Sequence, residues 1–229
     1  MTGPYRLVSF DLDGTLVDTA AEIAEAACLA LEEQGLPRRP VPEIVALIGH
    51  GTETLIRALL ARAVAEDPAR AGQVAEAALL ASMDKHYART TGTTARPYPG
   101  AREAVDRLGA HGVFLACVTT TESRHAQRVL EATGLDDCFA LVIGGDTLPF
   151  KKPDARVLQR VMELAGATPA TTAHVGDSGI DVQAARNAGV AAWVVPYGYN
   201  GGRPIAEAGP DRVFPGLAAV ADHVLGTGT

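Results

Sequence analysis

Short apolar runs, polar or glycine-containing loops and helical patterns alternate along most of this chain. The apolar runs are nearly continuous, which is typical of strands that are covered on both faces of a sheet. Strands that alternate with helices form parallel sheets through right-handed crossovers, so the predicted fold is α/β with a doubly wound parallel sheet. Strands are predicted at 5–11, 113–119, 140–145, 171–177 and 191–196, and helices at 20–34, 122–133, 153–166, 179–188 and 216–225.

The alternation stops between Leu36 and Pro99, where only helical patterns occur. The segments that flank this stretch, GLPRRP and TTGTTARPYPG, are rich in the glycine, proline and threonine of linkers. We therefore expect a small helical domain that is inserted into the α/β domain. Its predicted bounds are 20–96, which leaves 1–19 and 97–229 as the core.

Composition argues against several classes of protein. The formal net charge of −7, with no stripe of lysine or arginine, argues against nucleic-acid binding. No apolar run is long enough to cross a bilayer, and the N-terminus lacks the pattern of a signal peptide. The three scattered cysteines form neither a disulfide framework nor a Cys-x-x-Cys metal pair. We expect a cytoplasmic protein that binds neither nucleic acid nor membranes, and its oligomeric state, monomer or homodimer, stays open.

Two carboxylates, Asp11 and Asp13, end the first apolar run in the stretch FDLDGTLVDT. Carboxylates this close repel each other, and burying either costs free energy unless a cation lies between them. In an open parallel sheet, ligands bind at the carboxyl ends of the strands, so reactive residues at other strand ends should meet this pair. Those residues are Thr119, Lys152, Asp177 and Asp181.

This set of residues suits a magnesium site. Asp11, Asp13 and Asp177 can share Mg2+, which prefers oxygen ligands and retains some waters. Asp181 follows Asp177 by one helical turn, and we expect it to orient the metal's water ligands or to share in coordination. A calcium loop that begins at Asp11 is rejected, because Leu16 stands where that loop needs glycine and a strand precedes it.

The same residues predict phosphoryl transfer. Asp11 is placed to act as the nucleophile and to form an aspartyl-phosphate. Asp13 is placed to protonate the leaving oxygen and then to activate water, as general acid and base. The Thr119 hydroxyl, nearby backbone N–H groups and Lys152 are expected to hold the phosphoryl oxygens.

Four motifs, DLDGTLVD, VTT, KKPD and GDSGID, resemble in order those of the haloacid dehalogenase superfamily of phosphotransferases. The match covers essentially the whole chain. It implies a Rossmann-like core, dependence on Mg2+, Asp11 as nucleophile and Asp13 as acid and base. The helical insert then corresponds to the mobile C1-type cap of that family, which closes over the site. The acid at position 13 favours phosphoryl transfer over carbon–halogen cleavage, because the dehalogenase branch lacks it.

Two longer segments, 144–154 and 195–214, are similar to the bacterial phosphoglycolate phosphatase branch of this superfamily. The resemblance implies a small phosphorylated metabolite as substrate, with 2-phosphoglycolate as first choice. Thr120 and Thr121 depart from the asparagine and lysine that are usual in this branch, and Ala155 replaces a second proline. A sugar-phosphate phosphatase or phosphomutase with the same core stays open, as does a phospholigand-binding domain without turnover.

The cap is expected to select the substrate, because the core meets mainly the phosphate. The candidate segment is IGHGTETLIRALL, where Gly49 and Gly51 allow the backbone to approach a ligand. His50, Thr52 or Arg57 could add positive charge or hydrogen bonds. Alternatively, His50 is an exposed turn residue and Arg57 lies on a solvated helix face.

Other polar residues are candidates for the same site. The backbone N–H of Thr120 is predicted to bind phosphate. Tyr197 and Tyr199, in the run YGYN, either contact the substrate or pack in a turn after the last predicted strand. His174 and the other histidines outside the cap segment show no metal-ligand spacing, and no role is assigned to them.

Overall fold

The computed structural model describes residues 5–227, so residues 1–4 and 228–229 of the predicted core lie outside the described range. Six strands form one sheet in the order β5-β4-β1-β6-β7-β8, and every neighbouring pair is parallel. This confirms the predicted α/β fold with a parallel sheet. The strands are β1 Leu7–Phe10, β4 Phe114–Val118, β5 Leu141–Ile143, β6 Thr172–Gly176, β7 Ala191–Val194 and β8 Arg212–Val213.

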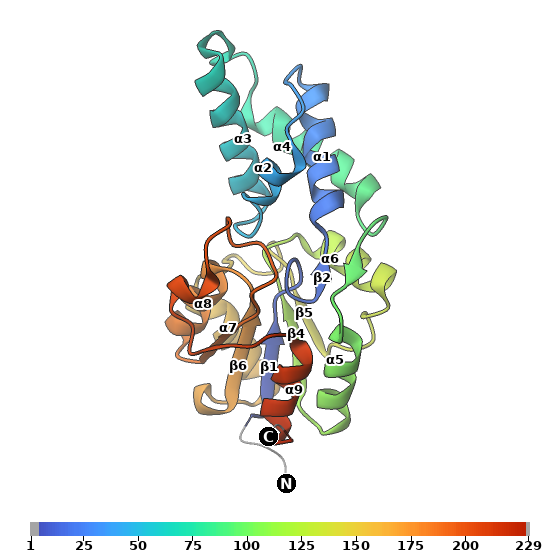
Figure 1. Cartoon of the computed structure of the whole chain (residues 1–229), viewed down its shortest axis with the longest axis vertical. Helices are drawn as coiled ribbons and strands as arrows, with labels where there is room; N and C mark the ends of the chain where they lie inside the picture. The colour runs from blue at the N-terminus through green and yellow to red at the C-terminus, as the bar shows by residue number, and fades with distance from the viewer. Residues whose placement is uncertain (1–4, 228–229) are drawn as a thin grey trace.

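Helices cover both faces of this sheet (Figure 1). Alternate residues of β1 point to opposite faces, so Val8 and Phe10 pack with α5, α6 and α9, while Leu7 packs with α7 and α8. No helix among residues 5–227 is both long and apolar enough to cross a membrane. The covering helices are α5 Ala101–Ala110, α6 Ser123–Thr133, α7 Ala155–Ala165, α8 Gly179–Ala188 and α9 Leu217–Leu225.

Four further helices lie beyond the carboxyl ends of the central strands (Figure 1). They bury an apolar cluster of their own, in which Leu31, Ile56, Leu59, Leu79 and Met83 are almost fully buried. Short 3-10 helices occur in the connections between elements, namely η1 Pro68–Arg70, η2 Pro169–Thr171 and η3 Ile205–Ala208. The four helices are α1 Ala20–Glu33, α2 Val41–Val45, α3 Thr52–Glu66 and α4 Glu76–Thr90.

A two-stranded antiparallel ribbon stands where the chain enters and leaves this helical layer. It pairs β2, Val17–Asp18, with β3, Arg96–Pro97. The sequence predicted only helices between Leu36 and Pro99, so β3 corrects that expectation. A strand of two residues carries no periodicity, and pairing with a distant segment is what creates it.

Glu22 joins the entry and exit of the helical layer. Its side chain is 1% exposed and accepts hydrogen bonds from the backbone N–H groups of Gly92, Thr94 and Ala95, at 3.1, 3.2 and 3.0 Å. An ionised carboxylate can accept all three, because it carries lone pairs on both oxygens and no proton. Glu22 therefore fixes the α4–β3 connection against the first turn of α1.

We expect Glu22→Gln to lower the free energy of unfolding by about 2 kcal/mol, because the amide group of glutamine turns a donor toward a buried N–H. Urea denaturation followed by circular dichroism measures this change. Glu25→Gln is the matched control, since Glu25 lies on the same helix in an exposed ion pair with Arg38. Equal stability of the two variants would show that the Glu22 carboxylate does not hold the connection.

Candidate active site

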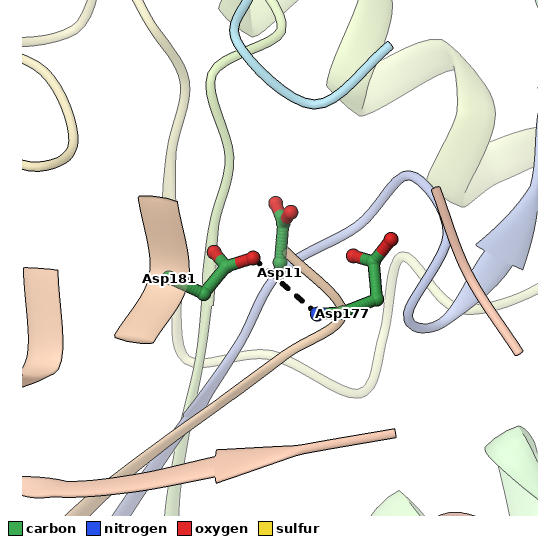
Figure 2. Close-up of side chains that lie close together, drawn as sticks. All are labelled: Asp11, Asp177 and Asp181. Atoms are coloured by element: carbon green, nitrogen blue, oxygen red, sulfur yellow. Dashed lines mark hydrogen bonds between the residues drawn. The ribbon is translucent and has the colours of Figure 1, made fainter. Parts of the chain in front are cut away.

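Three carboxylates gather at the carboxyl ends of the central strands (Figure 2). Asp11 follows β1, Asp177 follows the neighbouring β6, and Asp181 lies in the first turn of α8. Each side chain is buried and offers an oxygen, and these oxygens all lie within 4.8 Å of one another. The structure thus brings together three of the acids that the sequence placed in one site.

Asp177 is held by donors on both of its oxygens. Its Oδ1 accepts from the Thr15 hydroxyl at 2.8 Å, and its Oδ2 accepts from the backbone N–H of Tyr199 at 2.5 Å. Two glycines allow this approach, because a Cβ at Gly14 or Gly198 would lie 2.3 or 2.2 Å from Oδ2. One carboxylate position is therefore fixed by two loops that are far apart in sequence.

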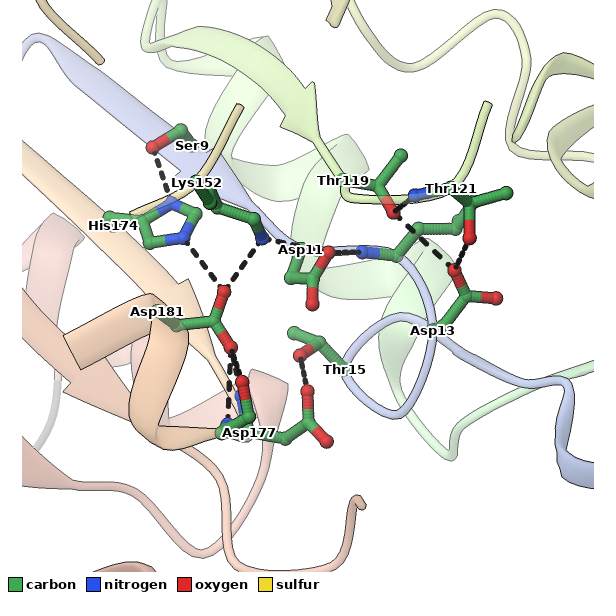
Figure 3. A network of polar contacts seen from close by, with 12 residues as sticks. Ser9, Asp11, Asp13, Thr15, Thr119, Thr121, Lys152, His174, Asp177 and Asp181 are labelled. Atoms are coloured by element: carbon green, nitrogen blue, oxygen red, sulfur yellow. Dashed lines mark hydrogen bonds and ion pairs between the residues drawn. The ribbon is translucent and has the colours of Figure 1, made fainter. Parts of the chain in front are cut away.

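Asp181 has protein donors on both oxygens as well, and more of them (Figure 3). Lys152 and His174 contact Oδ1 at 2.7 and 3.2 Å. Ser178 donates to Oδ2 through its hydroxyl at 2.6 Å and through its backbone N–H at 3.1 Å. With so many lone pairs in use, Asp181 is better suited to hold Lys152 in place than to bind a ligand directly.

Asp11 retains a free oxygen. Its Oδ1 accepts from the Leu12 N–H at 2.8 Å and lies 3.0 Å from the Lys152 ammonium. Its Oδ2 meets no hydrogen-bond donor within the part of the chain that the structure describes. That oxygen is available to a cation or to an incoming electrophile.

Burial and mutual repulsion set the charge of this cluster. Burial, opposed by the Lys152 charge, raises the pKa of Asp11 to about 7, and burial together with the other two acids raises the pKa of Asp177. Burial alone would raise the pKa of Asp181 too, but Lys152 and His174 hold it below its usual range. A divalent cation would relieve this repulsion and favour the ionised form of all three acids, so the all-oxygen site fits a hard divalent cation.

The Asp13 side chain lies outside this cluster, among hydroxyl groups. Its Oδ2 accepts from Thr121 at 2.7 Å and from Thr119 at 3.4 Å, and its Oδ1 accepts from Thr19 at 2.6 Å. The sequence predicts that Asp13 shares the cation with Asp11, whereas in the structure its carboxylate is bound by hydroxyl groups on the side of the helical layer. The Thr119 hydroxyl, which the sequence predicts to hold a phosphoryl oxygen, likewise donates its hydrogen bond to Asp13.

A cavity between the sheet edge and the helical layer opens onto these residues. The core contributes Asp11, Asp13, Thr120 and Thr121, and the helical layer contributes mainly apolar side chains. Five residues of the predicted specificity segment line it, namely Ile48, Gly49, Gly51, Thr52 and Leu55.

His50 and Arg57 do not line this cavity. His50 borders a separate hollow beside Asn200 and Arg203. The Arg57 side chain is 58% exposed and pairs with Glu53 and Glu76 at 2.8 and 2.9 Å. The structure thus separates these two predicted substrate-binding residues from the carboxylates.

Several residues of the site were not predicted. The spacing of the histidines predicts no role for His174, yet this side chain is buried between Asp181 and the Ser9 hydroxyl. A signal was present, because a polar residue inside an apolar strand must find a partner when it is buried. Thr15 gave no comparable signal, and the run YGYN left Tyr199 between substrate contact and packing, because the contacts of both residues to Asp177 depend on loops that only folding brings together.

Comparisons with known proteins agree with this arrangement. The model of the family described as haloacid dehalogenase-like hydrolase matches residues 8–195. A protein of Thiobacillus denitrificans named phosphoglycolate phosphatase is 40% identical over 220 residues, which cover 95% of each chain. A protein of that name from Pseudomonas putida is 41% identical over 216 residues, covering 94% of this chain and 78% of the relative. A solved structure described as a predicted phosphoglycolate phosphatase from Haemophilus somnus superposes with a TM-score of 0.89 at 30% identity, covering 95% of this chain and 96% of that one.

Proposed function

The chain belongs to the haloacid dehalogenase-like hydrolases, and from this membership we propose that it is a Mg2+-dependent phosphomonoesterase that acts on 2-phosphoglycolate. The observation that carries the proposal is the free Oδ2 of Asp11, a carboxylate that lines the cavity and pairs through Oδ1 with a buried lysine. A nucleophilic carboxylate needs such an unpaired oxygen and a neighbouring positive charge. The relatives named phosphoglycolate phosphatase support the choice of substrate.

Asp11 and Asp177 would hold the magnesium ion, because both keep acceptor capacity after their protein hydrogen bonds are counted. Bound there, the ion would offset the repulsion between phosphate and carboxylates and draw charge from the phosphoryl oxygens. Asp181 would not bind the ion directly and would instead hold Lys152 beside Asp11. This division of labour revises the expectation that the Asp13 side chain is a metal ligand.

In the first chemical step, Asp11 Oδ2 attacks phosphorus and the ester P–O bond breaks. Asp13 gives its proton to the leaving oxygen, so the products of this step are an alcohol and an aspartyl-phosphate. The hydroxyls of Thr19 and Thr121 keep the Asp13 carboxyl fixed on the cavity side of Asp11. Lys152 and the backbone N–H of Thr120 would stabilise the phosphoryl oxygens.

In the second step, Asp13 takes a proton from water as that water attacks phosphorus. The bond between phosphorus and Asp11 Oδ2 breaks, which releases phosphate and regenerates the Asp11 carboxylate and the protonated Asp13. The hydroxyl groups of Thr19 and Thr121 hold Asp13 in the same position in both steps. The same carboxyl group can therefore act first as the acid and then as the base.

We propose that residues 20–96 form the cap that selects the leaving group. Their side of the cavity is mostly apolar, and it includes the backbone at Gly49, Gly51 and Thr52, where α3 begins without a side-chain cap. Free N–H groups at the start of a helix favour an anionic group such as the carboxylate of glycolate. The apolar side chains also narrow the cavity, which would favour a short leaving group.

The test is phosphate release from 2-phosphoglycolate, sugar phosphates, nucleotides and pyrophosphate, each with Mg2+ and with a chelator. We expect 2-phosphoglycolate to lead in kcat/KM by about 100-fold or more, because an anion site discriminates against neutral leaving groups. The chelator should abolish release. A sugar phosphate in the lead would overturn the substrate assignment and leave the phosphatase, whereas no release from any ester would favour a phospholigand-binding domain.

A further inference from the structure

Tyr199 belongs to the core by sequence but packs in the helical layer. It lies in the loop after β7, which rises toward that layer in orange in Figure 1. The ring is 6% exposed and is part of the apolar cluster of α1–α4. The same loop borders α2, where Tyr199 lines a hollow with Pro42 and Val45. Tyr199 is therefore the point at which the core loop is inserted into the cap.

The Tyr199 hydroxyl fixes the start of α1. It accepts hydrogen bonds from the backbone N–H groups of Thr19 and Ala20, both at 2.9 Å, and donates to Asp18 Oδ1 at 2.5 Å. The N-cap residue Thr19 makes no side-chain capping bond, so the phenol oxygen takes over that function. One donor and two lone pairs are the full capacity of a phenol, and all are used.

The backbone of the same residue holds a carboxylate of the active site. The Tyr199 N–H donates to Asp177 Oδ2 at 2.5 Å. Gly198 packs so closely against Asp177 that a Cβ there would lie 2.2 Å from this oxygen. Any shift of the loop must therefore move Asp177 or break its hydrogen bond.

We propose that Tyr199 is a positioning residue that couples the entry to the cap, at the start of α1, to Asp177, so that cation binding and a fixed cap entry favour each other. The inference rests on the proposed function only in that Asp177 holds the cation. Coupling of this kind is reciprocal: a cation that fixes Asp177 fixes the loop, and the loop fixes the entry to the cap. A tyrosine that merely packs in the cap core would stabilise the cap equally with and without the cation.

Amide hydrogen exchange at Thr19 and Ala20, measured with and without saturating Mg2+, tests this coupling without turnover. In the wild-type protein we expect Mg2+ to slow exchange at these amides by about 5-fold or more. In Tyr199→Phe, which keeps the ring and the N–H, calorimetry should still detect Mg2+ binding, but the slowing should fall below about 2-fold. Faster exchange at baseline alone would reflect lost capping, so the ratio with and without Mg2+ is decisive.

Two further variants complete the test. Asp18→Ala removes the exposed acceptor of the Tyr199 hydroxyl, which also accepts from the Ala20 N–H at 3.2 Å, and it should weaken the Mg2+ effect at Thr19 as well. Tyr5→Phe is the control, because Tyr5 packs on Trp193 near the amino end of β1, and it should keep the full effect. Full Mg2+-dependent slowing in both Tyr199→Phe and Asp18→Ala would overturn the inference.

The outcomes separate this inference from the proposed function. A wild-type protein that releases phosphate but shows no Mg2+-dependent slowing overturns the coupling alone. In the other case, Mg2+ slows amide exchange in the wild-type protein but not in Tyr199→Phe, and the wild-type protein hydrolyses no phosphate ester. That result would overturn the proposed function and support the coupling.

Discussion

Asp11→Asn is expected to lower kcat by about 10,000-fold or more, because the amide cannot act as the nucleophile that forms the acyl phosphate. The substitution should lower turnover without lowering the stability of the fold. Asp11 is one of three buried carboxylates that repel one another, so removing its charge relieves part of that repulsion. Asparagine also keeps an oxygen that can accept from Leu12 N–H and Lys152. The melting temperature in chelator should therefore be no lower than that of the wild-type protein.

Steady-state phosphate release, together with thermal unfolding in chelator, makes the comparison. Asp136→Asn serves as the control, since Asp136 is exposed and lies away from the cluster, and both quantities should stay at wild-type values. Normal turnover by Asp11→Asn would remove Asp11 from the role of nucleophile. A large fall in melting temperature would instead assign Asp11 a structural role beside Lys152.

The parallel sheet was predictable because its central strands are covered on both faces. The nearly continuous apolar runs correspond to β1, β4, β5, β6 and β7, with ends that differ by at most two residues. Helix α5 was missed although Ala101, Ala104, Val105 and Leu108 follow the helical period and are buried. The short strands β2, β3 and β8 carry no pattern of their own, since only tertiary pairing defines them.

The rule that ligands bind at the carboxyl ends of strands was enough to bring Asp11, Lys152 and Asp177 together. It could not give the direction of the Asp13 side chain, which depends on the three hydroxyls that surround it. Nor could it place Arg57, because the face that α3 presents to the cavity is set by packing within the helical layer. The roles assigned to these residues stay predictions, and their positions are what the structure adds.

Lys152→Met is expected to have the largest effect on stability. The ammonium is fully buried between Asp11 and Asp181, at 3.0 and 2.7 Å, and methionine keeps much of the volume without the charge. Removing it leaves buried carboxylates with no cation, so the free energy of unfolding in chelator should fall by about 3–5 kcal/mol. Turnover should be lost as well, since Lys152 lies against the nucleophile.

The pH dependence of this deficit has a definite sign. Lys152 holds the pKa of Asp181 below its usual range against the effect of burial, so its stabilisation is present at neutral pH and disappears in acid. Without the lysine, burial raises that pKa, and the folded variant takes up protons more readily than the unfolded chain. The deficit should therefore be larger at about pH 8 than at about pH 5.

Urea denaturation in chelator at both pH values measures the deficit, and Lys151→Met is the matched control. Lys151 is the preceding residue, its side chain is 47% exposed and its partner Glu53 lies at 3.5 Å, so its loss should cost under about 0.5 kcal/mol. Added Mg2+ should restore more stability to Lys152→Met than to the wild-type protein, because the cation replaces the missing charge and binds only the folded state. Equal stability of the two lysine variants would mean that the carboxylates are neutral in the folded protein, and the site would then need another source of charge.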